Sequence, residues 1–228
     1  MTQAPTGVHH VAFMAGDIKS HIEFFSQVVG APLVAIFDMH GVPGGLHAFL
    51  KLGAHNYFSV VQLPGVDEIP REIGRTHAGW GGGTSAAGTL QHIALAADDE
   101  AHLLALRDRI RSHGVNVMGP LDHGFCKSIY FAGPDDMTLE IACPARELVP
   151  DRWIDPAVCE RAGIGPDDLA LYRSPTPYHG ETPVPQPPYD AAKPHMRYPS
   201  EELYRAILAA PDEALAKAAA YVEPPVPA

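Results

Sequence analysis

The chain has 228 residues, enough for one large domain or two small ones, and 46% of them are hydrophobic. Its 16 Lys and Arg stand against 27 Asp and Glu, and the formal net charge of -11 argues against binding to nucleic acid or to anionic membrane surfaces. No apolar run approaches the length of a membrane span, no secretory signal is visible at the start, and the three cysteines form no CxxC pair. We therefore expect a cytoplasmic protein with reduced thiols.

The first strand and helix in chain order belong to an internal repeat. HHVAFMAGD, which ends at Asp17, aligns with QHIALAADD, which ends at Asp99, at an offset of 82 residues. In each copy an alternating apolar strand (8–14 or 90–96) precedes an aspartate suited to cap a helix, and an apolar helical stripe ends at Gly30 or Gly114. Three short strands follow, at 32–39, 46–52 and 57–62 in the first copy and at 115–121, 126–131 and 138–142 in the second. The sequence predicts an α+β protein with two βαβββ modules.

Composition divides the rest of the chain. The modules span 7–63 and 89–145, and a long connection, 64–88, joins them. Fifteen of the 23 prolines lie between Pro150 and Pro227, so residues 146–228 are predicted to form a Pro-rich extension with short helices, the better two at 200–210 and 212–221. Its apolar side chains need a surface to cover. An arm across a partner subunit, a lid over the chain's own cavity and a ligand for a foreign domain all remain open, and we favour the arm of a homodimer or higher homo-oligomer.

Two histidines and one glutamate form the candidate metal site. His10 and His92 occupy the same position in the two copies, and Glu140 lies between the apolar residues Leu139 and Ile141 of a predicted strand. A buried carboxylate needs a cation, and two imidazoles with one carboxylate leave open positions typical of non-haem Fe(II), with Mn(II) as a possible substitute. The offset of 82 aligns Phe58 of the first copy with Glu140 of the second, so no fourth acidic ligand is expected.

These residues resemble the vicinal oxygen chelate superfamily, which includes glyoxalase I, epimerases, resistance proteins and extradiol ring-cleaving dioxygenases. The resemblance is closest to the extradiol enzymes, whose signature is matched by His123-GFCKS-Ile129-Tyr130-FAG-Pro134-DDMTL-Glu140. It implies that the paired modules form a curved, half-open barrel around the metal. The implied function is cleavage of a catechol-like aromatic diol with O₂ by an Fe(II)-dependent dioxygenase of aromatic catabolism.

The same resemblance implies catalytic roles for three further side chains. His123 would bond an iron-bound oxygen, Tyr130 would bond the substrate hydroxylate, and His55 would be an acid–base residue just before the last strand of the first module. His47 and His40 are alternatives to His55 for the cavity lining. Two other functions remain open, namely a metal-dependent isomerase or lyase of the glyoxalase or epimerase type, and a resistance protein that sequesters a small molecule.

Overall fold

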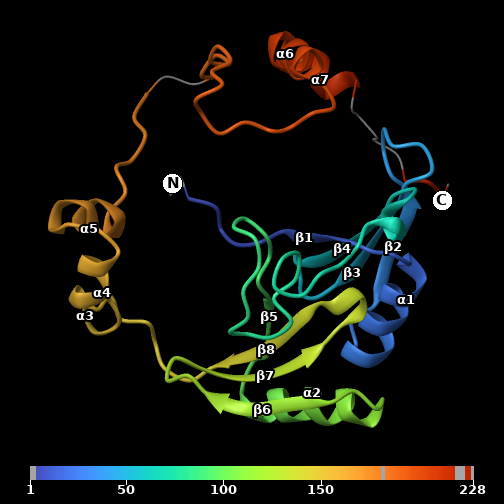
Figure 1. The fold of residues 1–228 in the computed structure, drawn as a ribbon, viewed down its shortest axis with the longest axis vertical. Coiled ribbons are helices and arrows are strands. Elements are labelled where there is room, and N and C mark those ends of the chain that lie inside the picture. The colour runs from blue at the N-terminus through green and yellow to red at the C-terminus, as the bar shows by residue number, and fades with distance from the viewer. Residues whose placement is uncertain (1–3, 181–182, 219–223, 227–228) are drawn as a thin grey trace. The chain divides into compact units, whose positions relative to one another are not determined.

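The computed structural model describes residues 4–180, 183–218 and 224–226 (Figure 1). The first module consists of β1 (His10–Met14), α1 (Ile18–Glu23), the π-helical η1 (Phe24–Val29), β2 (Leu33–Asp38), β3 (Leu46–Lys51) and β4 (Tyr57–Gln62). The second consists of β5 (Ile93–Ala96), α2 (Glu100–Ser112), β6 (Val117–Asp122), β7 (Cys126–Ala132), the 3-10 turn η3 (Pro134–Asp136) and β8 (Thr138–Pro144). The predicted α+β class and the βαβββ order of both copies are confirmed.

Each module forms its own four-stranded mixed sheet. The strand orders are β1-β4-β3-β2 and β5-β8-β7-β6, with the first strand of each copy parallel to the last. The helices begin where the sequence predicts, because Asp17 accepts hydrogen bonds from the amides of Lys19 and Ser20, and Asp99 accepts one from the amide of His102. Gly30, at φ 96°, ends η1 in the left-handed conformation that glycine adopts without strain.

The helix-covered faces of the two modules contribute to one apolar core. Buried side chains of both sheets belong to a single cluster, which includes Phe25 and Phe58 of the first module and Leu103 and Ile141 of the second. The end of η1 joins the modules directly, since the Arg109 guanidinium donates to the Gln27 and Val28 carbonyls at 2.6 and 3.1 Å.

The half-open barrel around a metal stays a prediction, because the strands of the isolated chain do not form one continuous sheet. The described strands form two separate sheets with no closed barrel, and β1 and β5 each lie at an edge of their own sheet (Figure 1). The physical reason is that the modules pack within the chain through η1, α2 and the core, so that β1 and β5 do not pair with each other.

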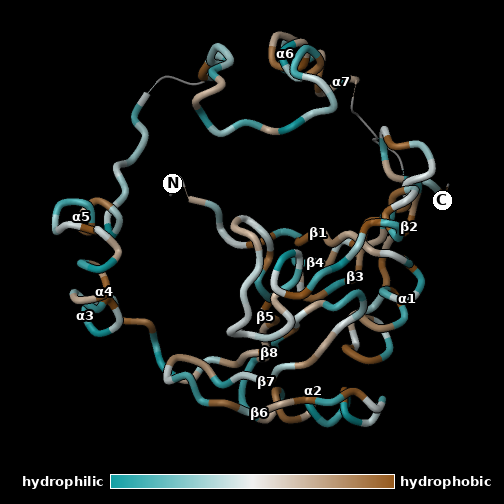
Figure 2. The backbone as a smooth tube through the Cα atoms, viewed as in Figure 1, coloured by the Kyte–Doolittle hydropathy of each residue, from teal (hydrophilic) through white to brown (hydrophobic). Residues whose placement is uncertain are grey.

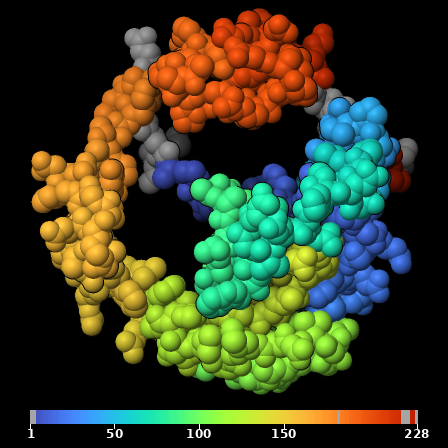
Figure 3. Space-filling model, in the orientation of Figure 1, coloured from blue at the N-terminus to red at the C-terminus, as the bar shows by residue number. Residues whose placement is uncertain are grey.

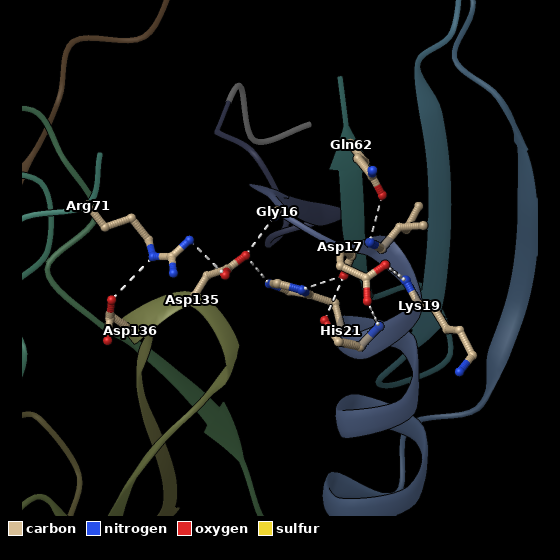
Figure 4. Close-up of polar contacts among 10 residues, drawn as sticks. Gly16, Asp17, Lys19, His21, Gln62, Arg71, Asp135 and Asp136 are labelled. Atoms are coloured by element: carbon tan, nitrogen blue, oxygen red, sulfur yellow. Dashed lines mark hydrogen bonds and ion pairs between the residues drawn. The ribbon is translucent and has the colours of Figure 1, made fainter. Parts of the chain in front are cut away.

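A polar cluster also ties the second module to the first (Figure 4). The Asp135 carboxylate, in the turn before β8, accepts a hydrogen bond from the Gly16 amide at 2.6 Å and pairs with the Arg71 guanidinium at 3.0 Å. Its Oδ2 atom also lies 3.6 Å from Nε2 of the fully buried His21. The turn holding the GPDD segment therefore helps to join the modules, a contact that no local pattern in the sequence indicates.

The connection between the modules, residues 64–88, contains the short η2 (Val66–Glu68). It lies in front of the two modules in Figure 3. Beyond β8 come α3 (Pro150–Trp153), α4 (Pro156–Arg161), α5 (Pro166–Arg173), α6 (Glu201–Ala209) and α7 (Asp212–Ala218). The last two correspond to the predicted helices 200–210 and 212–221, although residues 219–221 lie outside the described part of the chain.

Contacts divide the chain into two compact units. One spans 4–170 and holds both modules, and the other contains the described residues from Leu171 onward. The extended stretch between α5 and α6 is mostly white and teal in Figure 2, as its proline and polar content predicts. No helix within the described ranges has the length and apolar character needed to cross a membrane.

Candidate functional site

Four of the six predicted site residues lie together on one face of the second sheet. Nε2 of His92, which immediately precedes β5, is 2.9 Å from Oε2 of Glu140 on β8. Tyr130 on β7 pairs with Glu140 in the strand register, and its hydroxyl lies 3.0 Å from Nε2 of His123. His123 stands in the β6–β7 turn, where its amide donates to the Cys126 carbonyl. The hairpin geometry thus brings the signature residues into one line of polar contacts.

The polar group formed by His92, Glu140, Tyr130 and His123 is partly shielded from solvent. Glu140 is only 5% exposed, although it lies on the face opposite the apolar core. Burial, followed by the negative charge of Glu140, raises the pKa of the Tyr130 phenol, while a bond to Ser128 opposes that rise. The phenol is therefore protonated at neutral pH and available as a hydrogen-bond donor. A cleft of about 250 Å³, lined by His92 and also by Gln91, His77 and Asp135, opens beside the group.

Gln91 is a site residue that the sequence reasoning missed. Its Nε2 atom donates to the carbonyls of Trp80, Gly81 and Gly83, at 3.2, 2.9 and 3.2 Å, which fixes the orientation of the amide. Its Oε1 atom therefore accepts a hydrogen bond from Nδ1 of His92. Strand alternation offered no signal for this role, because the contacts are with an irregular loop that lies 8 to 11 residues earlier in the chain.

This arrangement can be tested for its fit to a metal. With a proton on Nδ1 of a neutral His92, the lone pair of Nε2 faces the Glu140 carboxylate across 2.9 Å. Two lone pairs at that distance require a proton or a cation to bind them both. An imidazole and a carboxylate are also a pair of ligands that Fe(II) and Mn(II) bind. The chemistry of this pair fits two of the three expected metal positions.

The structure does not bring His10 to this pair. His10 is exposed on β1 of the first sheet, where its ring contacts Phe49 at 5.8 Å and its Nδ1 lies 2.9 Å from Nδ1 of His9. Within the described residues, no group of three or more His, Cys, Asp or Glu side chains is placed to hold one metal ion. The predicted triad is therefore divided between the two sheets of the isolated chain.

His55 is exposed in the turn between β3 and β4, just before the last strand of the first module, and its catalytic role stays a prediction. The alternatives His47 and His40 lie on or beside the first sheet. Nε2 of His47 is 2.5 Å from the buried Ser59 hydroxyl, and the His40 ring stacks on Phe37 at 5.1 Å. His10, His47 and His40 thus share an aromatic region of the first module.

The strand register corrects the expected counterpart of Glu140. Ala12 pairs with Ser59, and its repeat partner Ala94 pairs with Glu140, so Ser59 rather than Phe58 is equivalent to Glu140. The chain between the two strands is one residue longer in the first copy, which the constant offset of 82 concealed. Ser59 is not acidic either, so the first module still offers no fourth carboxylate at this position.

The environment of His47 predicts a pH-dependent stability. Burial, then repulsion from His10 and from His40, lowers the pKa of His47 below its ordinary value of 6.5. The folded protein then binds fewer protons than the unfolded chain, so this contribution to stability is complete above about pH 6.5 and is lost as the pH falls through the lower folded pKa. We expect the fall in Tm between about pH 7.5 and pH 5 to be smaller in His47→Asn than in the parent.

Thermal unfolding followed by circular dichroism at several pH values measures this effect. His55→Asn is the matched control, because His55 is exposed in a turn. An identical pH dependence of Tm in the parent and in His47→Asn would contradict the assignment.

Residues 7–141 match the family model described as the Glyoxalase/Bleomycin resistance protein/Dioxygenase superfamily. The chain belongs to this superfamily. The match covers both modules as far as β8 and includes all the predicted site residues. Membership of the superfamily accounts for the paired βαβββ modules, and it includes enzymes as well as binding proteins.

Several solved structures are similar to this superfamily member. An antibiotic-binding protein, TnmS3 from Streptomyces sp. CB03234, is 24% identical, with 63% of this chain and all of that chain covered and a TM-score of 0.43. A domain of the superfamily from Frankia sp. EAN1pec is 13% identical over 62% and 100% of the two chains, with a TM-score of 0.49. A lactoylglutathione lyase from Agrobacterium tumefaciens is 20% identical over 62% and 96%, with a TM-score of 0.42. None of the curated proteins compared with this chain matches it.

Proposed function

We propose that the protein is an Fe(II)-dependent, extradiol-type dioxygenase that cleaves a catechol-like ring with O₂, with Mn(II) as a possible substitute for iron. The observation that carries the proposal is the contact series from His92 through Glu140 and Tyr130 to His123. A protein that only sequesters a small molecule does not need the buried Glu140 carboxylate beside the His92 imidazole. It also does not need the Tyr130 phenol and the His123 imidazole that follow in the same contact series. The chemistry that a bound Fe(II) ion supplies is Lewis acidity toward substrate oxygens and electron transfer to O₂.

The chain's own residues would orient the substrate and move its proton. The protonated Tyr130 phenol can donate a hydrogen bond to a substrate hydroxylate near Glu140. Nε2 of His123, 3.0 Å from that phenol, can take the phenol proton as the phenol oxygen takes a proton from a substrate hydroxyl, and can return it later by the reverse transfer. His123 is exposed, so protons can exchange with solvent at the outer end of this pair.

We further propose that the third metal position is filled by His10 of a second copy in a homodimer. Among the described strands β1 pairs only with β4, and β5 pairs only with β8, so each of these edge strands has one side open. His10 is exposed on the first of them, and His92 directly precedes the second. Edge pairing of β1 from one copy with β5 from another would bring the two imidazoles together and form the half-open barrel between chains.

Removal of either polar group beside Glu140 tests the proposed chemistry. We expect Tyr130→Phe and His123→Phe to retain the metal but to lower kcat by about 10²–10⁴, because each loses a positioned proton donor or acceptor. Oxygen uptake with a panel of catechols, after anaerobic loading with iron, measures the effect. Tyr172→Phe is the control, since Tyr172 is 61% exposed on α5. Parental rates in both variants, with a confirmed substrate, would contradict the proposal.

A second candidate function is sequestration of an aromatic small molecule. It is favoured by the row of rings on the first sheet, where Phe37 lies 5.4 Å from His47 and His47 lies 4.5 Å from Phe49. Such a protein would bind a catechol without consuming oxygen. The isomerase or lyase alternative would turn over its substrate under anaerobic conditions. Oxygen uptake therefore separates the dioxygenase from the other two functions, and anaerobic product analysis separates an isomerase or lyase from a sequestering protein.

A further inference from the structure

The loop of residues 80–83 packs closely against the candidate site. A Cβ atom at Gly81 would lie 3.4 Å from Cε1 of Tyr130, so the loop backbone lies beside that ring. At Gly83 a Cβ would be 2.0 Å from the Ala78 carbonyl oxygen, a distance that no side chain tolerates. The GWGGG sequence therefore permits a compact loop next to Tyr130, and glycine is required for its backbone to close.

One side chain holds this loop. Nε2 of Gln91 donates to three of its carbonyls, while Oε1 of the same amide accepts from Nδ1 of His92. An amide whose donor and acceptor ends are both engaged has only one orientation that satisfies all its partners. The position of the loop and the orientation of the His92 ring thus depend on the same planar group.

We propose that Gln91 is a positioning residue that joins the loop of residues 80–83 to the imidazole of His92. In this arrangement the loop lies beside Tyr130, and Nε2 of His92 faces Glu140. Loss of Gln91 releases both, because the loop carbonyls lose their donor and the imidazole loses the acceptor that keeps the proton on Nδ1. The consequence for metal affinity rests on the proposed function, whereas the consequence for the loop does not.

Two substitutions separate the two ends of the amide. Gln91→Leu has a similar size but lacks both polar ends, so it removes the loop contacts and the His92 contact together. Gln91→Glu keeps an acceptor for Nδ1 of His92 but cannot donate to the loop carbonyls. Gln27→Leu is the matched control, because Gln27 is exposed and its side-chain amide donates a hydrogen bond to the neighbouring Ser26.

The experiment uses the full chain and two measurements. Mn(II) titration gives the metal Kd, and chymotrypsin cleavage after Trp80, quantified by mass spectrometry, reports release of the loop. We expect Gln91→Leu to weaken Mn(II) binding about 10- to 100-fold, as is typical when a partner of a ligand histidine is removed, and to be cleaved faster. Gln91→Glu should be cleaved faster while retaining a Kd close to that of the parent.

Parental cleavage rates in both Gln91 variants would overturn the role in the loop, and a parental Kd in Gln91→Leu would overturn the link to His92. If the parent chain bound no Mn(II), the proposed metal function would fail, while the cleavage rates would still decide whether Gln91 holds the loop. If the parent bound Mn(II) and neither variant differed from it, only the role of Gln91 would be wrong.

Discussion

Glu140→Gln is expected to abolish stoichiometric iron binding while leaving the fold intact. Glu140 is the carboxylate that pairs with His92 among the residues that the structure describes, and the uncharged amide cannot neutralise a divalent cation. In the metal-free protein the amide has nearly the same shape as the carboxylate and can still form a hydrogen bond with Nε2 of His92, so the Tm of the metal-free variant should stay close to that of the parent. Loss of metal therefore cannot be mistaken for unfolding.

Elemental analysis after anaerobic loading and desalting measures the iron content of each variant, and circular dichroism measures Tm. Glu100→Gln is the control, because Glu100 forms an exposed ion pair with Lys127 on the same module. One iron per chain retained by Glu140→Gln would show that the metal, if present, lies elsewhere.

Mixing two inactive variants is expected to restore metal binding if the site is shared between copies. In a mixed dimer of His10→Ala and Glu140→Gln chains, one site combines both defects and the other combines the intact His10 with the intact His92 and Glu140. After random exchange of subunits in an equal mixture, half of the dimers are mixed, and one of the two sites in each mixed dimer is intact. The mixture should therefore recover about one quarter of the parental iron. Each variant alone should recover almost none.

A second mixture provides the control. His92→Ala and Glu140→Gln both change the second module, so every site in their mixed dimer carries one defect and no recovery is expected. Recovery in the first mixture and not in the second would support a site shared between chains. Absence of recovery in both, with subunit exchange verified by mass, would contradict the shared site and require another source for the third ligand.

Local features of the fold could be predicted from the sequence because short-range interactions determine them. Strand alternation and the repeat predicted two βαβββ modules, and Asp17 and Asp99 cap their helices as expected. The proximity of His123, Tyr130 and Glu140 also follows from short spacing, since β7 and β8 are neighbouring antiparallel strands. These residues lie within one module, and a regular hairpin register brings them together.

Other features depend on how distant segments pack, and only the tertiary structure decided them. The isolated chain joins its modules through η1, α2 and the core, so β1 and β5 stay in separate sheets and His10 lies apart from His92. Ser59 occupies the position equivalent to Glu140 because the first copy has one extra residue between its first and last strands, and a constant offset cannot detect that residue. Gln91 acquires its role from a loop that folds back onto Tyr130. Residue periodicity determines which face of a strand a side chain occupies, whereas the docking of modules and loops depends on the sum of many long-range contacts, which no local pattern records.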